Sequence, residues 1–309
     1  MMLKAAADPL RLEILRVLAQ GSYGVLELCQ ILDLKQSGLS HHLKVLAQGE
    51  LVATRREGNS IFYRRSHLAT DHPHFGFVAQ LFETIDQLKL SETVQHQLNS
   101  VARERASNSQ AFFAANANKF REQQDLIASY DVYKEQVSDI LNSVVPATAH
   151  SCLEIGPGEG EFLSVLAKKF NQVTALDNSL DMLNRAQRLC QQQHLDNVQL
   201  VLGDSSVAIE KTLTADCIVM NMVLHHVPNP AELFQHSTQL LHHSGALIVT
   251  DLCHHNQQWV TESCGDLWLG FEPEDLTEWA AQAGLNEGQS IFFALRNGFQ
   301  IQIRHFLKI

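Results

Sequence analysis

The sequence predicts an α+β part at the N-terminus followed by an α/β part with a mainly parallel sheet. Three observations indicate this division. Helical periodicity and a hairpin pattern occupy residues 1–72, and strands alternate with helices from residue 151 onward. The chain then ends in two apolar strands around Asn297 and Gly298. At 309 residues, it is long enough for two domains that each bury a core.

Charge is distributed unevenly between the two parts. Residues 1–70 contain nine Lys and Arg against six Asp and Glu, whereas the whole chain has a net charge of −11. Only the N-terminal part therefore suits an anionic partner. We find no signal segment and no apolar run that could cross a bilayer, so we expect a cytoplasmic protein. The six cysteines form no CxxC pair, and we expect free thiols.

The first 50 residues predict three helices. Residues 7–21 carry leucines at helical spacing and end at a glycine cap. A short helix is expected at residues 25–32, and Ser37 is the predicted N-cap of a third helix that ends near Gly49. Joined by a tight turn, the second and third helices make a helix-turn-helix.

Residues 51–65, LVATRREGNSIFYRR, predict a hairpin. Two stretches rich in β-forming residues flank Gly58 and Asn59, a pair that favours a tight turn. The two strands carry four arginines, Arg55, Arg56, Arg64 and Arg65. A basic hairpin after a helix-turn-helix is a wing, so residues 1–72 predict a winged helix-turn-helix domain for DNA.

Residues 73–109 predict a helical connector that also serves dimerisation. The sequence from Phe75 to Val145 is rich in Gln, Ala and Glu, with a polar interruption at residues 104–110. The first helix after the wing carries an apolar stripe that a lone winged domain could not bury, and we expect a homodimer through this helix and the first helix of the chain. The stripe consists of Phe75, Val78, Leu81, Phe82 and Ile85.

Residues 110–309 predict the α/β domain. Apolar strands are expected at residues 152–155, 173–177, 198–204, 215–221 and 246–252, with a helical pattern after most of them. Because such alternation produces parallel strands covered by helices, we expect a parallel sheet. The hairpin around Asn297 and Gly298 adds one antiparallel terminal strand.

Glycines follow the first of these strands. Gly156, Gly158 and Gly160 stand at a strand-to-helix turn, where missing side chains let backbone amides approach a ligand. Asp177 ends the next strand, where a carboxylate can accept hydrogen bonds from both hydroxyls of a ribose. Asp204 ends the third strand at the same edge. A nucleoside could lie across these three turns.

This pattern resembles the class I S-adenosylmethionine-dependent methyltransferases from about residue 110 to the C-terminus. Glu161 stands where a dinucleotide fingerprint requires its last glycine, and the segments NMVLHHVPNPAELF and GALIVTDL are also similar to this family. The resemblance implies a Rossmann-like fold that binds S-adenosylmethionine or S-adenosylhomocysteine. It places the first motif around the methionine part, Asp177 on the ribose, Asp204 on the adenine amino group and Met182 beside the base. The implied cofactor residues are Glu154, Gly156, Gly158, Gly160, Asp177, Asn178, Met182, Gly203, Asp204, Ser205 and Asn221.

The N-terminal part resembles the ArsR-type winged helix-turn-helix repressors over residues 1 to about 70. The similarity lies in ADPLRLEILRVL, SGLSHHLKVL and RREGNSIFYRR. It implies that the helix from Ser37 to Gln48 enters the major groove of double-stranded operator DNA while the wing follows the phosphates. The expected DNA contacts are Ser37, Ser40, His41, Lys44, Arg55, Arg56, Arg64 and Arg65. For His41, exposure without contact stays an alternative, and His42 is expected to be solvated or on the dimer side.

No metal site is assigned from the sequence. Many repressors of this type sense metals through paired cysteines, but Ile31 stands where a second thiolate would accompany Cys29. His67, His72 and His74 follow the wing in an expected loop without helical pairing. In the second domain, which distantly resembles arsenite methyltransferases, Cys253 and Cys264 are too few to indicate an arsenic site.

No catalytic residue is assigned either, although His225 is a candidate on the substrate side because it follows the fourth strand near the cofactor edge. Two functions stay open. The first is a dimeric transcriptional regulator whose methyltransferase-type domain binds the adenosyl cofactor as an effector. The alternative is an active methyltransferase of a small-molecule acceptor with an autoregulatory DNA-binding domain. The first is slightly favoured, because no substrate-side group of residues stands out, yet methyl transfer needs mainly alignment.

Overall fold

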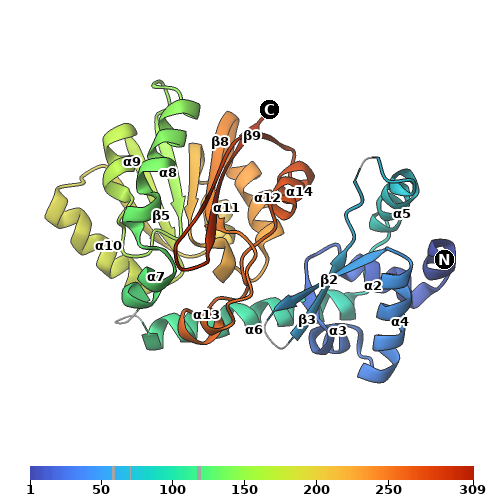
Figure 1. The fold of residues 1–309 in the computed structure, drawn as a ribbon. Helices are drawn as coiled ribbons and strands as arrows, with labels where there is room; N and C mark the ends of the chain where they lie inside the picture. The colour runs from blue at the N-terminus through green and yellow to red at the C-terminus, as the bar shows by residue number, and fades with distance from the viewer. Residues whose placement is uncertain (58–59, 70, 117–119) are drawn as a thin grey trace. The chain divides into compact units, whose positions relative to one another are not determined.

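The computed structural model describes residues 1–57, 60–69, 71–116 and 120–309 (Figure 1). The chain divides into two compact units, Met1–Ala106 and Ser107–Ile309. The hairpin turn predicted at Gly58 and Asn59 lies outside the described residues. Within the described ranges, none of the helices has the length and apolarity that crossing a bilayer requires.

The first unit begins with four helices, α1 (Met2–Ala6), α2 (Pro9–Val17), α3 (Val25–Leu32) and α4 (Gln36–Gln48). Asp8 caps α2 by accepting a hydrogen bond from the Arg11 amide at 3.0 Å. The helix predicted over residues 7–21 is shorter in the structure, because α2 ends at Val17. The predicted N-cap is also wrong: α4 starts at Gln36 behind an extended Lys35, which places Ser37 inside the first helical turn.

A tight turn separates α3 from α4. Asp33 adopts a left-handed conformation (φ 51°) and ends α3, and the Leu34 amide then donates to the Cys29 carbonyl at 2.9 Å. The two helices bury a shared apolar core beneath the turn. Its fully buried members include Leu28, Ile31, Leu39, Leu43 and Leu46. These residues fix which face of α4 is left for solvent.

Three short antiparallel strands complete the winged part: β1 (Tyr23–Gly24), β2 (Val52–Glu57) and β3 (Ser60–Arg65), in the order β1-β3-β2. Arg65 turns inward at the base of this sheet. Its guanidinium donates to both carboxylate oxygens of Asp86 at 2.8 and 2.6 Å and to the Leu15 carbonyl at 2.7 Å. Arg65 therefore ties the wing to the following helix, α5 (Phe75–Asp86).

Part of the apolar stripe on α5 is buried within the unit itself. Val78 and Ile85 are each 3% exposed and belong to the core of the first unit. The expectation that a lone winged domain could not bury this stripe is therefore wrong for these two residues. Phe75 and Phe77 remain 37% and 40% exposed.

The next helix, α6 (Glu92–Asn116), contributes residues to both units. Val94, Leu98 and Val101 are buried in the core of the first unit. The end of α6 belongs to the second unit, and there the Phe112 ring lies against Gly265. A Cβ at Gly265 would be only 2.4 Å from this ring, so Phe112 packs directly on the Gly265 backbone. One helix therefore carries residues of the first core and a residue that packs on the backbone of the second unit.

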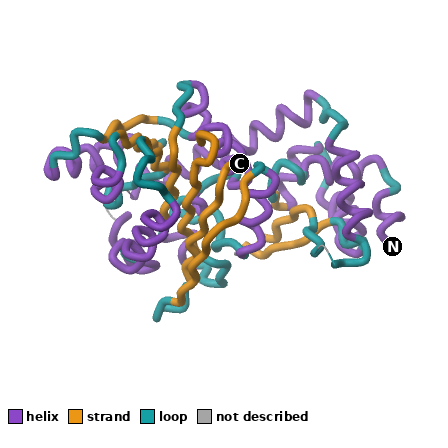
Figure 2. The backbone as a smooth tube through the Cα atoms, turned by 90° about the horizontal axis from the view of Figure 1, so that it is seen from above, coloured by secondary structure: helices purple, strands orange, loops and turns teal. Residues whose placement is uncertain are grey.

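The second unit is built on a seven-stranded sheet in the order β6-β5-β4-β7-β8-β10-β9 (Figures 1 and 2). Only β10 runs antiparallel to its neighbours, β8 and β9, which confirms the predicted mainly parallel sheet with an antiparallel terminal strand. The reversed strand lies between two others rather than at the edge. The strands are β4 (Ser151–Ile155), β5 (Gln172–Asp177), β6 (Val198–Leu202), β7 (Ala215–Asn221), β8 (Leu241–Leu252), β9 (Leu285–Ala294) and β10 (Gln300–Lys308).

Helices connect and cover these strands. They are α7 (Phe120–Ala128), α8 (Tyr130–Val144), α9 (Leu163–Lys169), α10 (Leu180–Gln193), α11 (Ser205–Glu210), the 3-10 helix η1 (Leu224–His226), α12 (Pro230–Leu240), α13 (Trp259–Ser263) and α14 (Pro273–Gln282). In the central strands, Ile155 pairs with Leu176 on one side and with Met220 on the other. The loops after β4, β5 and β7 therefore leave the sheet at one edge, where strand order reverses.

Candidate functional site

The glycine loop after β4 is open at its centre and packed at its ends. Gly156, Gly158 and Gly160 have φ of 70°, 56° and 89°. A Cβ on Gly156 would lie 2.3 Å from the Val223 side chain, and one on Gly160 would lie 2.9 Å from Leu163, whereas one on Gly158 would meet nothing within 4 Å. The backbone at Gly158 is therefore the part of the loop that a ligand can approach closely.

Two carboxylates and one amide converge beside this loop. Glu154 is 1% exposed, and burial raises the pKa of its carboxyl to about 8. The Asn221 amide donates to one carboxylate oxygen of Glu154 at 3.5 Å, while the other oxygen has no partner among the described residues. Burial raises the pKa of Asp177 to about 6, although the amides of Ser179 and Gly158 oppose this shift. Such a site favours a cationic or hydroxyl-bearing ligand.

The residues predicted for the adenine end lie on the next two loops. The Gly203 amide donates to the Asp177 carbonyl at 2.9 Å, which joins the ends of β5 and β6. Asp204 caps α11 by accepting from the Ser206 and Val207 amides at 3.0 and 3.3 Å. The Ser205 hydroxyl lies 2.8 Å from the His236 ring. On α10 and the loop before it, Met182 is buried and Asn178 is exposed.

The loop after β7 begins with a strained turn that brings it against the glycine loop. Met222 has a φ of 54°, a conformation that costs a non-glycine residue about 1–3 kcal/mol. Its amide donates to the Thr250 carbonyl at 2.8 Å, which fixes the strained turn to β8. Val223 then packs on Gly156, and η1 follows. This turn places the start of η1 at the same edge of the sheet as the predicted cofactor residues.

His225 on η1 forms a buried pair with a residue that the sequence analysis did not single out. Its Nδ1 lies 2.8 Å from Asp251, whose carboxylate also accepts the Leu224 and Leu252 amides, each at 2.8 Å. Burial lowers the pKa of His225, but the charges of Asp251 and Asp266 outweigh it and raise the pKa to about 9. A charged residue near the carboxyl end of a strongly apolar strand was the available signal for Asp251.

The candidate DNA contacts on α4 share one exposed face. Ser37, Ser40, His41 and Lys44 are all exposed and follow helical spacing, opposite the buried leucines. His42 turns toward the core instead, and its Nδ1 lies 3.8 Å from the Asp8 carboxylate.

The four wing arginines do not share one environment. Arg56 is exposed, and Arg55 and Arg64 are half-buried. Arg65 is only 8% exposed and is paired with Asp86. The structure therefore places three wing arginines at or near the surface and one within the fold.

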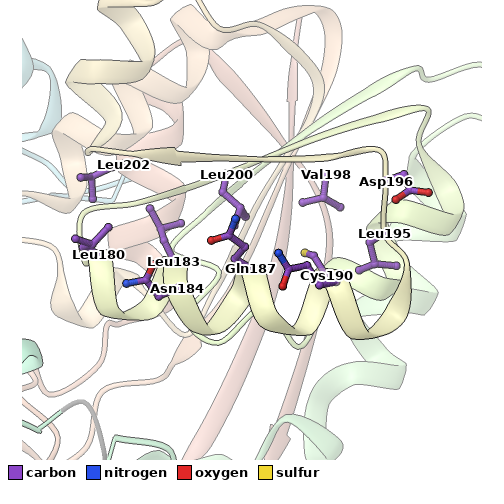
Figure 3. Close-up of a pocket in the computed structure, with 11 residues that line it drawn as sticks. Leu180, Leu183, Asn184, Gln187, Cys190, Leu195, Asp196, Val198, Leu200 and Leu202 are labelled. Atoms are coloured by element: carbon purple, nitrogen blue, oxygen red, sulfur yellow. The ribbon is translucent and has the colours of Figure 1, made fainter.

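A separate pocket of about 520 Å³ lies between α10 and the edge strand β6 (Figure 3). Leu183, Val198 and Leu200 line it together with the polar side chains of Asn184, Gln187 and Gln191. Burial raises the pKa of the Cys190 thiol in this pocket, which makes it a poor nucleophile.

Two family profiles match the chain. The family described as "Methyltransferase domain" matches residues 102–290, and "Bacterial regulatory protein, arsR family" matches residues 8–54. The arsenical resistance operon repressor of Staphylococcus xylosus is 41% identical over 70 residues, 23% of this chain and 67% of the repressor. The carboxy-S-adenosyl-L-methionine synthase of Ruthia magnifica subsp. Calyptogena magnifica is 35% identical over 107 residues, 33% of this chain and 43% of the synthase. These matches confirm both resemblances expected from the sequence.

The similarity to whole proteins is partial. The chain spans between 36% and 67% of the length of the first curated relatives. A solved structure, that of a proposed sarcosine dimethylglycine methyltransferase from Galdieria sulphuraria, superposes with a TM-score of 0.50 at 14% identity, over 65% of this chain and 98% of its own. At that identity the likeness shows the fold alone, which is the Rossmann-like fold predicted from the sequence.

The buried carboxyl of Glu154 predicts a pH-dependent stability. Its folded pKa of about 8 lies above the ordinary 4.5, so the ligand-free fold loses stability as the pH rises from about 4.5 to about 8. Glu154→Gln removes this loss. We expect the variant to be more stable than wild type at pH 9 by a few kcal/mol, at about 1.4 kcal/mol per pKa unit, and to match it near pH 4.5.

Urea unfolding across this pH range measures the difference, with Glu210→Gln at an exposed position as the control. A constant difference between Glu154→Gln and wild type at all pH values would contradict the prediction.

Proposed function

Because the chain belongs to the methyltransferase domain family over residues 102–290, and residues 8–54 belong to the arsR family of bacterial regulatory proteins, we propose a dimeric DNA-binding regulator controlled by an adenosyl ligand. The second unit binds S-adenosylmethionine or S-adenosylhomocysteine as effector. The functional segments are residues 1–72 for DNA, 73–109 for connection and dimerisation, and 110–309 for the ligand. Since its partner is DNA, the regulator acts in the cytoplasm.

The observation that carries this proposal is the contact between α6 and the helix-turn-helix. Arg105, next to the boundary between the units, donates to both carboxylate oxygens of Glu27 at 2.7 and 2.6 Å and to the Ser22 carbonyl at 3.0 Å. Glu27 in turn accepts the Gly24 amide at 2.7 Å and so caps α3. Helix α6, which continues into the second unit, is therefore bonded to the first turn of α3, the first helix of the helix-turn-helix.

In the second unit, a series of contacts leads from the glycine loop to the other end of α6. Gly156 packs on Val223, which begins the turn that carries His226. The His226 ring lies 3.4 Å from the Gly265 carbonyl, and Gly265 packs on Phe112 of α6. A ligand that moves the loop after β7 would change the support of α6. It alters DNA binding only if it favours one dimer arrangement over another.

The ligand contacts follow from the loop geometry. Glu154, the one carboxylate there that is nearly inaccessible, suits the ammonium of a methionine moiety, which would favour its ionised form. Asp177 receives the ribose hydroxyls, and Asp204 lies at the adenine end. Gly158 offers the open backbone against which the ligand rests.

DNA contacts come from the exposed face of α4 and from the wing. Ser37, Ser40, His41 and Lys44 read or approach base edges, and Arg55, Arg56 and Arg64 bind phosphates. We assign Arg65 a supporting role, since its guanidinium is already bound to Asp86 and Leu15.

The dimer forms through apolar side chains that the first unit leaves exposed. Leu3 on α1 is 71% exposed, and Phe75 and Phe77 on α5 are 37% and 40% exposed. Phe75 and Phe77 lie on the helix after the wing that was expected to pair, whereas Leu3 lies on α1, which precedes the first helix expected over residues 7–21. Sedimentation of the free protein as a monomer at micromolar concentration would contradict the dimer.

The alternative function, methyl transfer to a small molecule, is favoured by the buried His225 and Asp251 pair at the cofactor edge. A histidine oriented by a carboxylate is an arrangement that general bases share. Transfer of labelled methyl groups to an acceptor, with operator affinity unaffected by either cofactor, would support this alternative.

The regulator proposal predicts ligand-dependent operator affinity. On an operator selected from random DNA by the wild-type protein, one of the two cofactors should change the Kd by about 5- to 150-fold, the usual range of coupling between sites. Asp177→Ala removes the ribose contact and should abolish this effect while leaving affinity without cofactor unchanged.

Fluorescence anisotropy of labelled operator measures both quantities. Asp196→Ala, an exposed carboxylate in the same unit, is the matched control and should keep the wild-type response. If saturating amounts of both cofactors leave wild-type affinity unaltered, the regulator proposal is wrong.

The DNA interface makes a second prediction, in which phosphate and base contacts respond differently. Arg55→Ala combined with Arg56→Ala should weaken binding to all sequences and reduce the salt slope by about 2, or roughly one per lost phosphate contact. His41→Ala should relax sequence preference and keep the salt slope.

Titrations of operator and unrelated DNA at several salt concentrations separate these outcomes. Arg103→Ala, an exposed arginine that bonds only its own helix, controls for lost charge. Wild-type affinity in the double wing variant would show that these two arginines do not contact DNA. Intact specificity in His41→Ala would show that His41 is solvated and makes no base contact.

A further inference from the structure

Three ionisable side chains meet in the interior of the second unit, beside the loop after β7. His225 and Asp266 are 0% and 1% exposed, and His226 is 8% exposed. Each offers one ligand atom, and these atoms all lie within 4.8 Å of one another. The ring centroids of the two histidines are 4.1 Å apart. This cluster joins η1 to a segment 40 residues further along the chain.

Several polar atoms in the cluster have no hydrogen-bond partner within the described ranges. They are Nε2 of His225 and both carboxylate oxygens of Asp266. Leaving such groups buried and unpaired is unfavourable, and more so when they are charged. His225 Nε2 and the Asp266 carboxylate belong to the same cluster but form no hydrogen bond with each other. A group that accepts electron pairs from both would satisfy them together.

Asp251 prepares His225 to be a ligand. In the neutral ring, with Nδ1–H donated to Asp251, the lone pair of His225 lies on Nε2, which has no hydrogen-bond partner among the described residues. The Leu224 and Leu252 amides fix the Asp251 carboxylate in turn. Metal-binding histidines almost always donate their second ring N–H to a carboxylate or carbonyl in this way. In His226, Nδ1 lies 3.4 Å from the Gly265 carbonyl and 3.9 Å from Asp266, and Nε2 lies 3.2 Å from the Gln124 side-chain amide, so an ion bound by His226 replaces one of these contacts.

We propose that His225, His226 and Asp266 bind one divalent transition-metal ion, with Zn²⁺ as the best match. Two imidazole nitrogens and one carboxylate suit Zn²⁺ rather than Mg²⁺ or Ca²⁺, which prefer oxygen ligands. A 2+ ion also balances the buried charges of Asp251 and Asp266. Three protein ligands leave a coordination position for water or a small ligand.

The three ligands lie at the same edge of the sheet as the predicted adenosyl residues but are not among them, so the site goes beyond the proposed regulation by that ligand. It is also distinct from the cysteine and histidine sites considered from the sequence. By joining η1 to Asp266, the ion fixes the Gly265 segment on which Phe112 packs.

Zn²⁺ titration of the chelator-treated full chain tests the proposal, with Co²⁺ as a spectroscopic probe. We expect one equivalent of Zn²⁺ per chain with a micromolar or lower Kd, and visible Co²⁺ absorption typical of nitrogen and oxygen ligands. Asp266→Asn should weaken Zn²⁺ binding at least about tenfold, and Asp251→Asn by about 10- to 100-fold through loss of orientation of His225. His243→Gln, an exposed histidine, is the matched control.

Folding of each variant is checked by circular dichroism and by S-adenosylhomocysteine binding, which does not involve these ligands. Asp266 makes no hydrogen bond with the described residues that Asn would break. His226→Gln removes a second ligand independently and should give the same loss. The proposal is overturned if wild type takes up no stoichiometric Zn²⁺. It is equally overturned if Asp266→Asn and His226→Gln bind Zn²⁺ like wild type, or if only His72→Gln with His74→Gln, near the wing, reduces binding.

Discussion

In the regulator proposed above, the link between the two units is α6, a helix with packing residues in each unit. Val94, Leu98 and Val101 of α6 are part of the first core, Arg105 caps the helix-turn-helix through Glu27, and Phe112 rests on a glycine of the second unit. A continuous helix resists bending, because each residue is held by its own hydrogen-bond ladder. This stiffness is the physical basis of the proposed coupling, in which a change of support at one end of α6 is felt at the other.

The second unit gathers its polar groups where its parallel strands end. Register between β4, β5 and β7 brings Glu154, Asp177 and Asn221 to one edge, and the strained turn at Met222 adds η1. Burial makes the ionised form of Glu154 unfavourable until a cation approaches. The same edge carries His225 and Asp266, and among the described residues Nε2 of His225 and both carboxylate oxygens of Asp266 have no hydrogen-bond partner. Ligand binding and stability are therefore linked at this edge.

Most of the fold could be predicted because its signals are local. Buried parallel strands produce apolar runs, and Gly156 to Gly160 mark the turn between strand and helix. The inward turn of Arg65 was also within reach, since neighbouring residues of a strand point to opposite faces and Arg64 and Arg65 cannot both face DNA. The burial of Val78 and Ile85, and the meeting of His225 with Asp266, depend on contacts between distant segments, for which single residues give no local signal. The N-cap of α4 at Lys35 rather than Ser37 reflects the weak preference that separates neighbouring cap positions.

Hydrogen–deuterium exchange of the full chain, with and without saturating S-adenosylhomocysteine or S-adenosylmethionine, tests the central claim that α6 communicates ligand binding to the helix-turn-helix. The account predicts that at least one ligand changes exchange of the α3 amides in residues 25–32. This change should disappear in Arg105→Met and persist in Arg103→Met, whose arginine is exposed. If both ligands change exchange in the wild-type chain only within residues 107–309, the claim is contradicted.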